Sequence, residues 1–206
     1  MAVNQKEHWN CIYSDDPSYF GDSPSLFCTR CINVMKESKC ASVLELGPGQ
    51  GRDTKYLIDS GMRVMTADYS EAACQQLQNR FGNKIAVMQT DLREGVKLPR
   101  ASVDACFSHM LFTMDFTDEQ LSKLMSDLKN AVVPGGLIMF SVRNQRDPGF
   151  GKGENLHDGV WENEKGFAVR YFSERDVRKL SEGFTIESIT EYNEGPKILY
   201  CVVLRN

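Results

Sequence analysis

Three glycines lie at alternate positions directly after a short apolar run: Gly47, Gly49 and Gly51. Carboxylates flank them, Glu45 on one side and Asp53 on the other. Glycine has no Cβ, so its backbone can approach a ligand closely and can adopt positive φ angles. The run and its glycines therefore predict a strand followed by a loop that binds a ligand through its backbone.

Two classes of ligand use such loops, dinucleotides and S-adenosylmethionine (SAM), and the glycine spacing separates them. The dinucleotide fingerprint is G-x-G-x-x-G, whereas this loop reads G-x-G-x-G and has Arg52 at the sixth position. No G-K-[ST] follows, which excludes a P-loop. Flanking acids disfavour a pyrophosphate but suit a sulfonium cation with an α-amino group. We therefore favour SAM over a nicotinamide cofactor.

The stretch ELGPGQGRD resembles motif I of the class I SAM-dependent methyltransferases, and the resemblance extends as ordered motifs over residues 40–142. In that family an acid ending the second strand binds the ribose hydroxyls, and Asp68 matches it. An acid or amide after the third strand lies near the adenine, where this chain has Asp91. The resemblance implies these cofactor-binding residues: Glu45, Gly47, Gly49, Gly51, Asp53, Asp68, Tyr69, Asp91, Leu92 and Ser108.

Some of these residues have simpler explanations. One carboxylate can accept hydrogen bonds from both ribose hydroxyls, which favours the cofactor role for Asp68 over a turn role. Glu45 could instead support the loop, and Asp53 could favour the positive end of its helix. Asp91 could belong to an ordinary turn.

Methyl transfer from SAM is an in-line displacement in which the cofactor carries the reactivity, so the protein mainly orients the acceptor. A base is needed only if the acceptor must lose a proton. His109, in FSHMLFTM, is the candidate base, and an ordinary loop histidine is the alternative. We place substrate contacts at these residues: Tyr19, Phe20, His109, Phe112, Arg143 and Tyr171.

Two segments are expected to select the acceptor. Residues 143–172 are long and rich in glycine and aromatics, which predicts a lid; the alternative is a surface β-excursion packed by its own Trp161, Phe167 and Phe172. Residues 1–40 are expected to close the pocket. Their stretch HWNCIYSDDPSYFGDSPSLF resembles small-molecule methyltransferases of the tellurite-resistance and thiopurine types.

Seven cysteines, an odd number, suggest reduced thiols rather than a disulfide framework. Cys28, Cys31 and Cys40 could bind a soft ion such as arsenic. A lone C-x-x-C without a second pair at zinc spacing is weak, so we interpret them as structural thiols and predict no metal site.

The elements that must position these residues alternate strand and helix. Apolar strands are expected at residues 42–46, 63–68, 84–89, 103–108 and 137–142. Near-continuous apolar strands with intervening helices indicate a parallel sheet covered on both faces. Another helix is expected over residues 24–37, capped by Ser23.

Two C-terminal runs, FTIESITEY and ILYCVVL, flank the turn NEGPK and must pair antiparallel. By resemblance, the α/β fold is the Rossmann-like class I methyltransferase fold. It has a mostly parallel seven-stranded sheet with a C-terminal antiparallel hairpin and helices on both faces, in one domain spanning residues 1–206.

The overall composition favours a small acceptor. Net charge is −4 from 24 basic and 28 acidic residues, with no basic run for nucleic acid. We expect no membrane span, no secretory signal and a cytoplasmic location. The expected function is methyl transfer from SAM to a small soluble acceptor. A protein or RNA methyltransferase and a non-catalytic SAM-binding module are the alternatives; the acceptor atom and oligomeric state are open.

Overall fold

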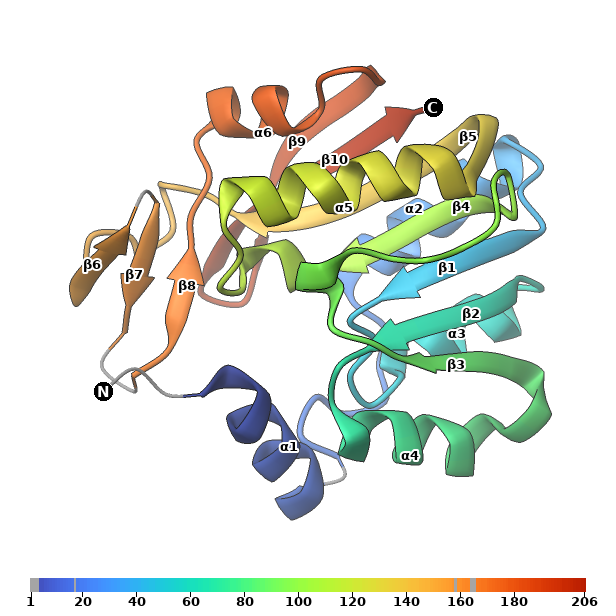
Figure 1. The fold of residues 1–206 in the computed structure, drawn as a ribbon, viewed down its shortest axis with the longest axis horizontal. Coiled ribbons are helices and arrows are strands. Elements are labelled where there is room, and N and C mark those ends of the chain that lie inside the picture. Colours follow the sequence, from blue (N-terminus) through green and yellow to red (C-terminus); the bar gives the residue numbers. More distant parts are fainter. Residues whose placement is uncertain (1–3, 17, 158, 164–165) are drawn as a thin grey trace.

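The computed structural model describes residues 4–16, 18–157, 159–163 and 166–206, and a seven-stranded sheet lies at its centre (Figure 1). The strand order is β3-β2-β1-β4-β5-β10-β9. The first five strands are parallel, and β10 pairs antiparallel with both β5 and β9. The strands are β1 (Ser42–Leu46), β2 (Arg63–Asp68), β3 (Ile85–Gln89), β4 (Val103–His109), β5 (Val132–Arg143), β9 (Thr185–Glu194) and β10 (Lys197–Arg205). This confirms the predicted sheet and its C-terminal hairpin.

Helices cover both faces of the sheet, with a separate apolar core under each layer. One layer consists of α2 (Leu26–Glu37), α3 (Arg52–Asp59) and α4 (Glu71–Phe81). The other consists of α5 (Asp118–Ala131) and α6 (Glu174–Leu180). An N-terminal helix, α1 (Gln5–Asp15), lies against α4 below the sheet in Figure 1, and Gln76 Nε2 donates to the Tyr13 carbonyl at 2.5 Å. Short 3-10 turns occupy Gly82–Lys84, Leu92–Glu94 and Leu111–Thr113.

Two boundaries and one whole helix differ from the sequence-based expectations. Helix α2 begins after Ser25, not Ser23, because the Ser25 hydroxyl accepts from the Cys28 amide and donates to Asp53. Strand β5 begins at Val132 rather than after the Pro-Gly-Gly turn, since Asn206 at the chain end bonds the backbone of this stretch. Helix α1 was not predicted at all; Tyr13 is its one buried residue among those described.

Within residues 143–172, three short strands form a small antiparallel sheet beside the main one (Figure 1). Its strands are β6 (Glu154–His157), β7 (Val160–Glu162) and β8 (Ala168–Arg170). We call this unit, residues 143–172, the insertion. Two of its aromatics pack on the rest of the chain: Phe172 lies in the main core, and Phe167 contacts the rings of His8 and Trp9 in α1. Within the insertion, the Phe150 ring contacts the rings of Trp161 and Tyr171. Gln5 Nε2 also donates to the Ala168 carbonyl at 2.6 Å, so the insertion and α1 are in contact.

Candidate functional site

The glycine loop between β1 and α3 has the left-handed backbone that its composition predicts. The φ angles are 65° at Gly47, 53° at Gly49 and 81° at Gly51. A Cβ at Gly49 would lie 2.9 Å from Tyr13 Oη, and one at Gly51 would lie 2.7 Å from Leu77 Cδ2. The loop therefore needs glycine for its φ angles and also because α1 and α4 approach its backbone.

Asp68 lies at the carboxyl end of β2, next to that loop, and is buried. Its Oδ2 accepts the Gly49 amide at 3.2 Å and its Oδ1 accepts the Ser70 amide at 2.9 Å. Burial raises the pKa of Asp68 to about 6, although the backbone donors oppose this. The carboxylate is thus mainly ionised at neutral pH and retains lone pairs that can accept further hydrogen bonds.

A cleft of about 390 Å³, including its open mouth, lies at the ends of the strands beside Asp68. Its walls are formed by Gln5, Gly47, Asp68, Tyr69, Asp91, Leu92, Arg93, Leu111, Met114, Asp115 and Phe116. Five of the residues expected to bind cofactor meet here, from the ends of three strands. The cleft combines apolar walls with carboxylates, which suits a nucleoside with a ribose and a flat base.

Arg93 was not predicted at this site. Its guanidinium holds Asp91 with Nη2–Oδ2 at 2.6 Å and Nε–Oδ1 at 3.0 Å. This hydrogen bonding lowers the pKa of the Asp91 carboxyl below its usual range. A basic residue two positions after the acid is the sequence signal that could have shown the pair.

Glu45 and Asp53 lie behind the glycine loop and are not among the residues that form the cleft walls. Thr54 Oγ1 donates to Glu45 Oε2 at 2.6 Å, while burial and then Asp53 raise the pKa of Glu45 to about 8. Asp53 accepts the Ser25 amide at 2.7 Å and the Ser25 hydroxyl at 2.8 Å. Both oxygens of Asp53 thus join α3 to the start of α2.

His109 ends β4 on the other side of the loop. Its Nδ1 lies 2.8 Å from Ser141 Oγ, and its Nε2 lies 3.3 Å from Glu194 Oε2 without making a hydrogen bond within the described part of the chain. Glu194 also lies 3.3 Å from Arg52 Nη2. Burial alone would raise the pKa of Glu194, but His109 and Arg52 hold it at about 2. No local sequence motif points to Glu194.

The remaining predicted substrate residues are dispersed. Phe112 is buried in the core against Phe140, whereas Tyr19 is 52% exposed. Arg143 pairs with the buried Asp147, with Nη2–Oδ1 at 2.5 Å, and its guanidinium lies over the Tyr171 ring.

Two further predicted residues lie closer to the glycine loop. The Arg52 guanidinium lies over the Phe20 ring, with Arg52 Cζ 5.6 Å from the ring centroid. Ser108 is buried, with its hydroxyl 3.4 Å from the Leu46 carbonyl.

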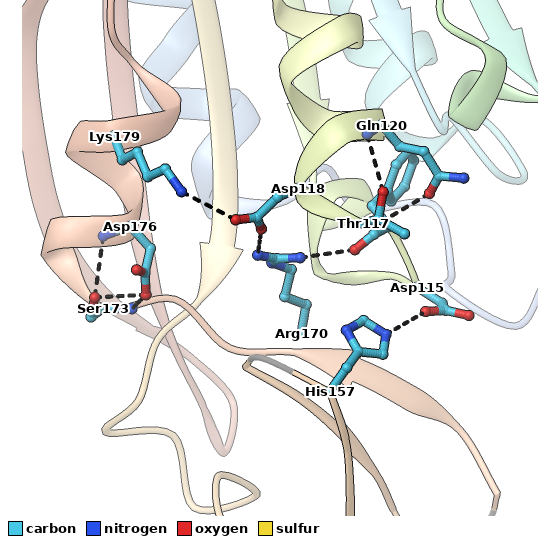
Figure 2. A network of polar contacts seen from close by, with 10 residues as sticks. Asp115, Thr117, Asp118, Gln120, His157, Arg170, Ser173, Asp176 and Lys179 are labelled. Atoms are coloured by element: carbon cyan, nitrogen blue, oxygen red, sulfur yellow. Dashed lines mark hydrogen bonds and ion pairs between the residues drawn. The ribbon is translucent and has the colours of Figure 1, made fainter.

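Polar contacts fasten the insertion to the cleft wall before α5 (Figure 2). Arg170 donates to the Phe116 carbonyl at 2.8 Å and pairs with Asp118. His157 Nε2 lies 3.4 Å from Asp115 Oδ1. Because Asp115 and Phe116 form part of the cleft wall, the insertion is in direct contact with that wall.

The cysteines pack as structural thiols. Cys28 and Cys31 are buried in the core under α2, where burial raises the pKa of both thiols. Cys40 Sγ lies 3.9 Å from the Asp104 carbonyl. Within the residues that the structure describes, no group of three or more His, Cys, Asp or Glu could hold a metal ion.

Comparisons with known proteins agree with this geometry. Residues 43–136 match the family model described as a methyltransferase domain. An uncharacterized methyltransferase of Geobacillus sp. is 26% identical over 116 residues, which span 56% of this chain and 54% of that protein. The chain thus aligns with about half of that relative's length.

Two solved structures share the fold. The 1,6-didemethyltoxoflavin-N1-methyltransferase of Burkholderia thailandensis has a TM-score of 0.76 at 18% identity, covering 98% of this chain and 87% of that one. The N-methyltransferase NodS of Bradyrhizobium japonicum has a TM-score of 0.72 at 14% identity, covering 99% of both chains. Both of those structures contain S-adenosylhomocysteine (SAH).

Residues 43–136 are therefore similar to a methyltransferase domain, and the chain has the Rossmann-like fold of the class I SAM-dependent methyltransferases. The finer likeness to the tellurite-resistance and thiopurine types stays a prediction.

Proposed function

We propose that this protein transfers a methyl group from SAM to a small organic acceptor. The observation that carries the proposal is Asp68, a buried carboxylate that accepts the Gly49 amide at the wall of the cleft. In the proposed complex it accepts hydrogen bonds from both ribose hydroxyls. Tyr69 and Leu92 lie against the adenine, and the loop at Gly47 lies along the methionine part.

The reaction needs little chemistry from the protein. A lone pair of the acceptor attacks the methyl carbon, the carbon–sulfur bond breaks with its electron pair left on sulfur, and SAH forms. An acceptor that carries a proton releases it to solvent or to a base. His109 is the candidate for that base, provided that its ring is freed from Ser141 or Glu194 when the acceptor binds.

Several observations favour a small acceptor. Helix α1 and the insertion, which contact one another beside the cleft, would limit access for a macromolecule if they act as the predicted closing segment and lid. One protein of the same fold was crystallised with a small heterocycle, 1,6-didemethyltoxoflavin. The net charge of −4 and the lack of a Lys/Arg run in the sequence do not favour a nucleic-acid acceptor.

Two predictions about the cellular setting belong to the same proposal. Among the described residues, no helix is long and apolar enough to cross a bilayer. We also propose that residues 1–206 act as one domain and that the protein works in the cytoplasm, where its own cysteines stay reduced.

The test uses methyl-labelled SAM, the purified protein and a cell extract separated into macromolecules and small molecules. Label in the small-molecule fraction is expected and supplies a product for mass spectrometry. Label in protein or RNA would overturn the acceptor class but leave the cofactor site intact. Binding of SAM without any transfer, across extracts of several sources, would support the non-catalytic module.

A further inference from the structure

A row of polar side chains lies on one face of four neighbouring strands at the carboxyl edge of β4 and β5. The strand register pairs His109 with Ser141, Arg143 with Leu199, and Lys197 with Glu194. Side chains alternate between faces along a strand. On each strand, the next residue on the same face lies in the core under α2 and α3: Phe107, Met139, Leu199 and Tyr192. His109, Ser141, Arg143, Glu194 and Lys197 thus share one side of the sheet.

Charges in this row are paired, with one exception. Arg143 is held by Asp147, which also accepts the Ile198 amide at 3.0 Å. Arg52 is paired with Glu194. For Lys197, no carboxylate of the described residues lies within 4.0 Å of the ammonium, and none of them forms a hydrogen bond with it. The row therefore contains one cation more than it contains anions.

Lys197 is partly buried, which makes this surplus charge costly. Burial, together with Arg143 and Arg52, lowers the pKa of its ammonium, while the nearby carboxylates of Glu194 and Asp147 oppose this without contacting it. A charge withdrawn from water is stabilised when a counter-ion reaches it. An anionic ligand would supply that counter-ion.

The position of Lys197 points to the acceptor rather than to SAM. Strand β10 is two strands from β4 and three strands from β1. At ordinary strand spacing, β10 therefore lies roughly 10 Å from β4 and roughly 14 Å from β1. The methionine part of SAM lies at the β1 loop in the proposed complex. Aromatic rings near the row, Phe20 under Arg52 and Phe27 at 6.2 Å from the His109 ring, provide apolar contact for an organic body.

We propose that Lys197 binds the anionic group of the methyl acceptor, and that the acceptor is a small organic anion bearing a carboxylate or phenolate. This inference rests on the proposed function. The ammonium holds the anion beside the glycine loop, whereas the guanidinium groups of Arg52 and Arg143 stay with their own carboxylates. The sulfonium of SAM attracts the same anion.

Three probes with one ring and different charge test the proposal: benzoate, benzamide and benzylamine. Their binding to the SAH-loaded protein is measured by ligand-observed NMR and calorimetry. Benzoate is expected to bind better than benzamide, and benzylamine is expected to bind worst. In Lys197→Met, which keeps the apolar stem, benzoate should weaken by roughly tenfold while benzamide is unchanged. Lys197→Arg should restore most of the loss.

Lys36→Met, an exposed lysine of α2, is the matched control and should change nothing. Equal binding of benzoate to wild type and Lys197→Met would overturn the proposal, as would undetectable benzoate binding or a preference for benzylamine. Weaker SAH binding in Lys197→Met would assign the lysine to the cofactor and overturn it too. Failure of the wild-type protein to bind SAH at all would instead reject the proposed function.

Discussion

Replacing Asp68 with alanine removes the carboxylate on which the proposed ribose site depends. Its oxygens accept two backbone amides and, in the complex, two ribose hydroxyls. A hydrogen bond to a charged group contributes about 1.5–3 kcal/mol. Losing both ribose bonds should therefore cost about 3–6 kcal/mol, a weakening of SAM binding of roughly 10²–10⁴-fold.

Isothermal titration with SAM and SAH measures this effect, and Asp104→Ala is a matched control. Asp104 also accepts two backbone amides, from Ala41 at 2.9 Å and Ser42 at 2.8 Å, but it lies near the start of β4, at the opposite edge of the sheet. Both variants should lose some stability in thermal unfolding, while SAM affinity falls only in Asp68→Ala. Near wild-type affinity in Asp68→Ala, or an equal loss in Asp104→Ala, would refute the ribose assignment.

The pH dependence of binding gives a second measure of the same carboxylate. Burial raises the pKa of Asp68 to about 6 in the ligand-free protein, and the proposed complex requires the ionised form. SAM affinity should be constant above this pH and fall by roughly tenfold for each pH unit below it. Asp68→Asn, which cannot titrate, should show no such slope. A wild-type profile that is flat down to pH 5 would contradict the mechanism.

Three further variants test the structure around the loop. Burial and Asp53 raise the pKa of Glu45 to about 8 in the folded protein. Between the ordinary pKa of a glutamate and pH 8, the folded state therefore keeps a proton on Glu45 that the unfolded state has lost. The free energy of unfolding consequently declines as the pH rises toward 8. Glu45→Gln should be roughly 2–4 kcal/mol more stable than wild type near pH 8 and similar near pH 5 in denaturant titrations; an unchanged difference across pH would exclude this. Gly51→Ala should lower stability by about 1–3 kcal/mol more than Gly61→Ala, because both have positive φ but only the first meets side chains within 3 Å; equal melting temperatures would show that φ alone matters. Asp53→Asn should cost about 1–2 kcal/mol in unfolding and leave SAM affinity intact; a parallel loss of affinity would return Asp53 to the cofactor site.

The central strands β1, β4 and β5 could be predicted because they are buried on both faces and read as near-continuous apolar runs. Helix α1 carries no such signal, since its one buried residue among those described is Tyr13. The start of α2 at Ser25 depends on Asp53, 28 positions away. The extension of β5 depends on Asn206, the last residue. Local sequence favours an element, but these boundaries are fixed by long-range hydrogen bonds.

The same distinction separates the two parts of the candidate site. Asp68, Tyr69 and Leu92 could be placed in the cleft because each directly follows or ends a parallel strand, and such ends meet at one edge. Glu194 contacts Arg52 across 142 positions of sequence. Arg52 belongs to the glycine motif but Glu194 belongs to no local motif, so only the folded arrangement brings them together.

The two parts of the carboxyl edge differ in charge, and this difference suits the reaction. Asp68 is available to the cofactor side, while Lys197 leaves a surplus cation on the acceptor side. In the proposed complex, the sulfonium of SAM lies between Asp68 and Lys197. An acceptor anion is therefore attracted both to Lys197 and to this sulfonium. Transfer of the methyl group converts the sulfonium to the neutral thioether of SAH, so the attraction between the two ligands ends with the reaction. If the anion is itself the nucleophile, its charge is consumed as well, and Lys197 then loses its counter-ion and no longer retains the product.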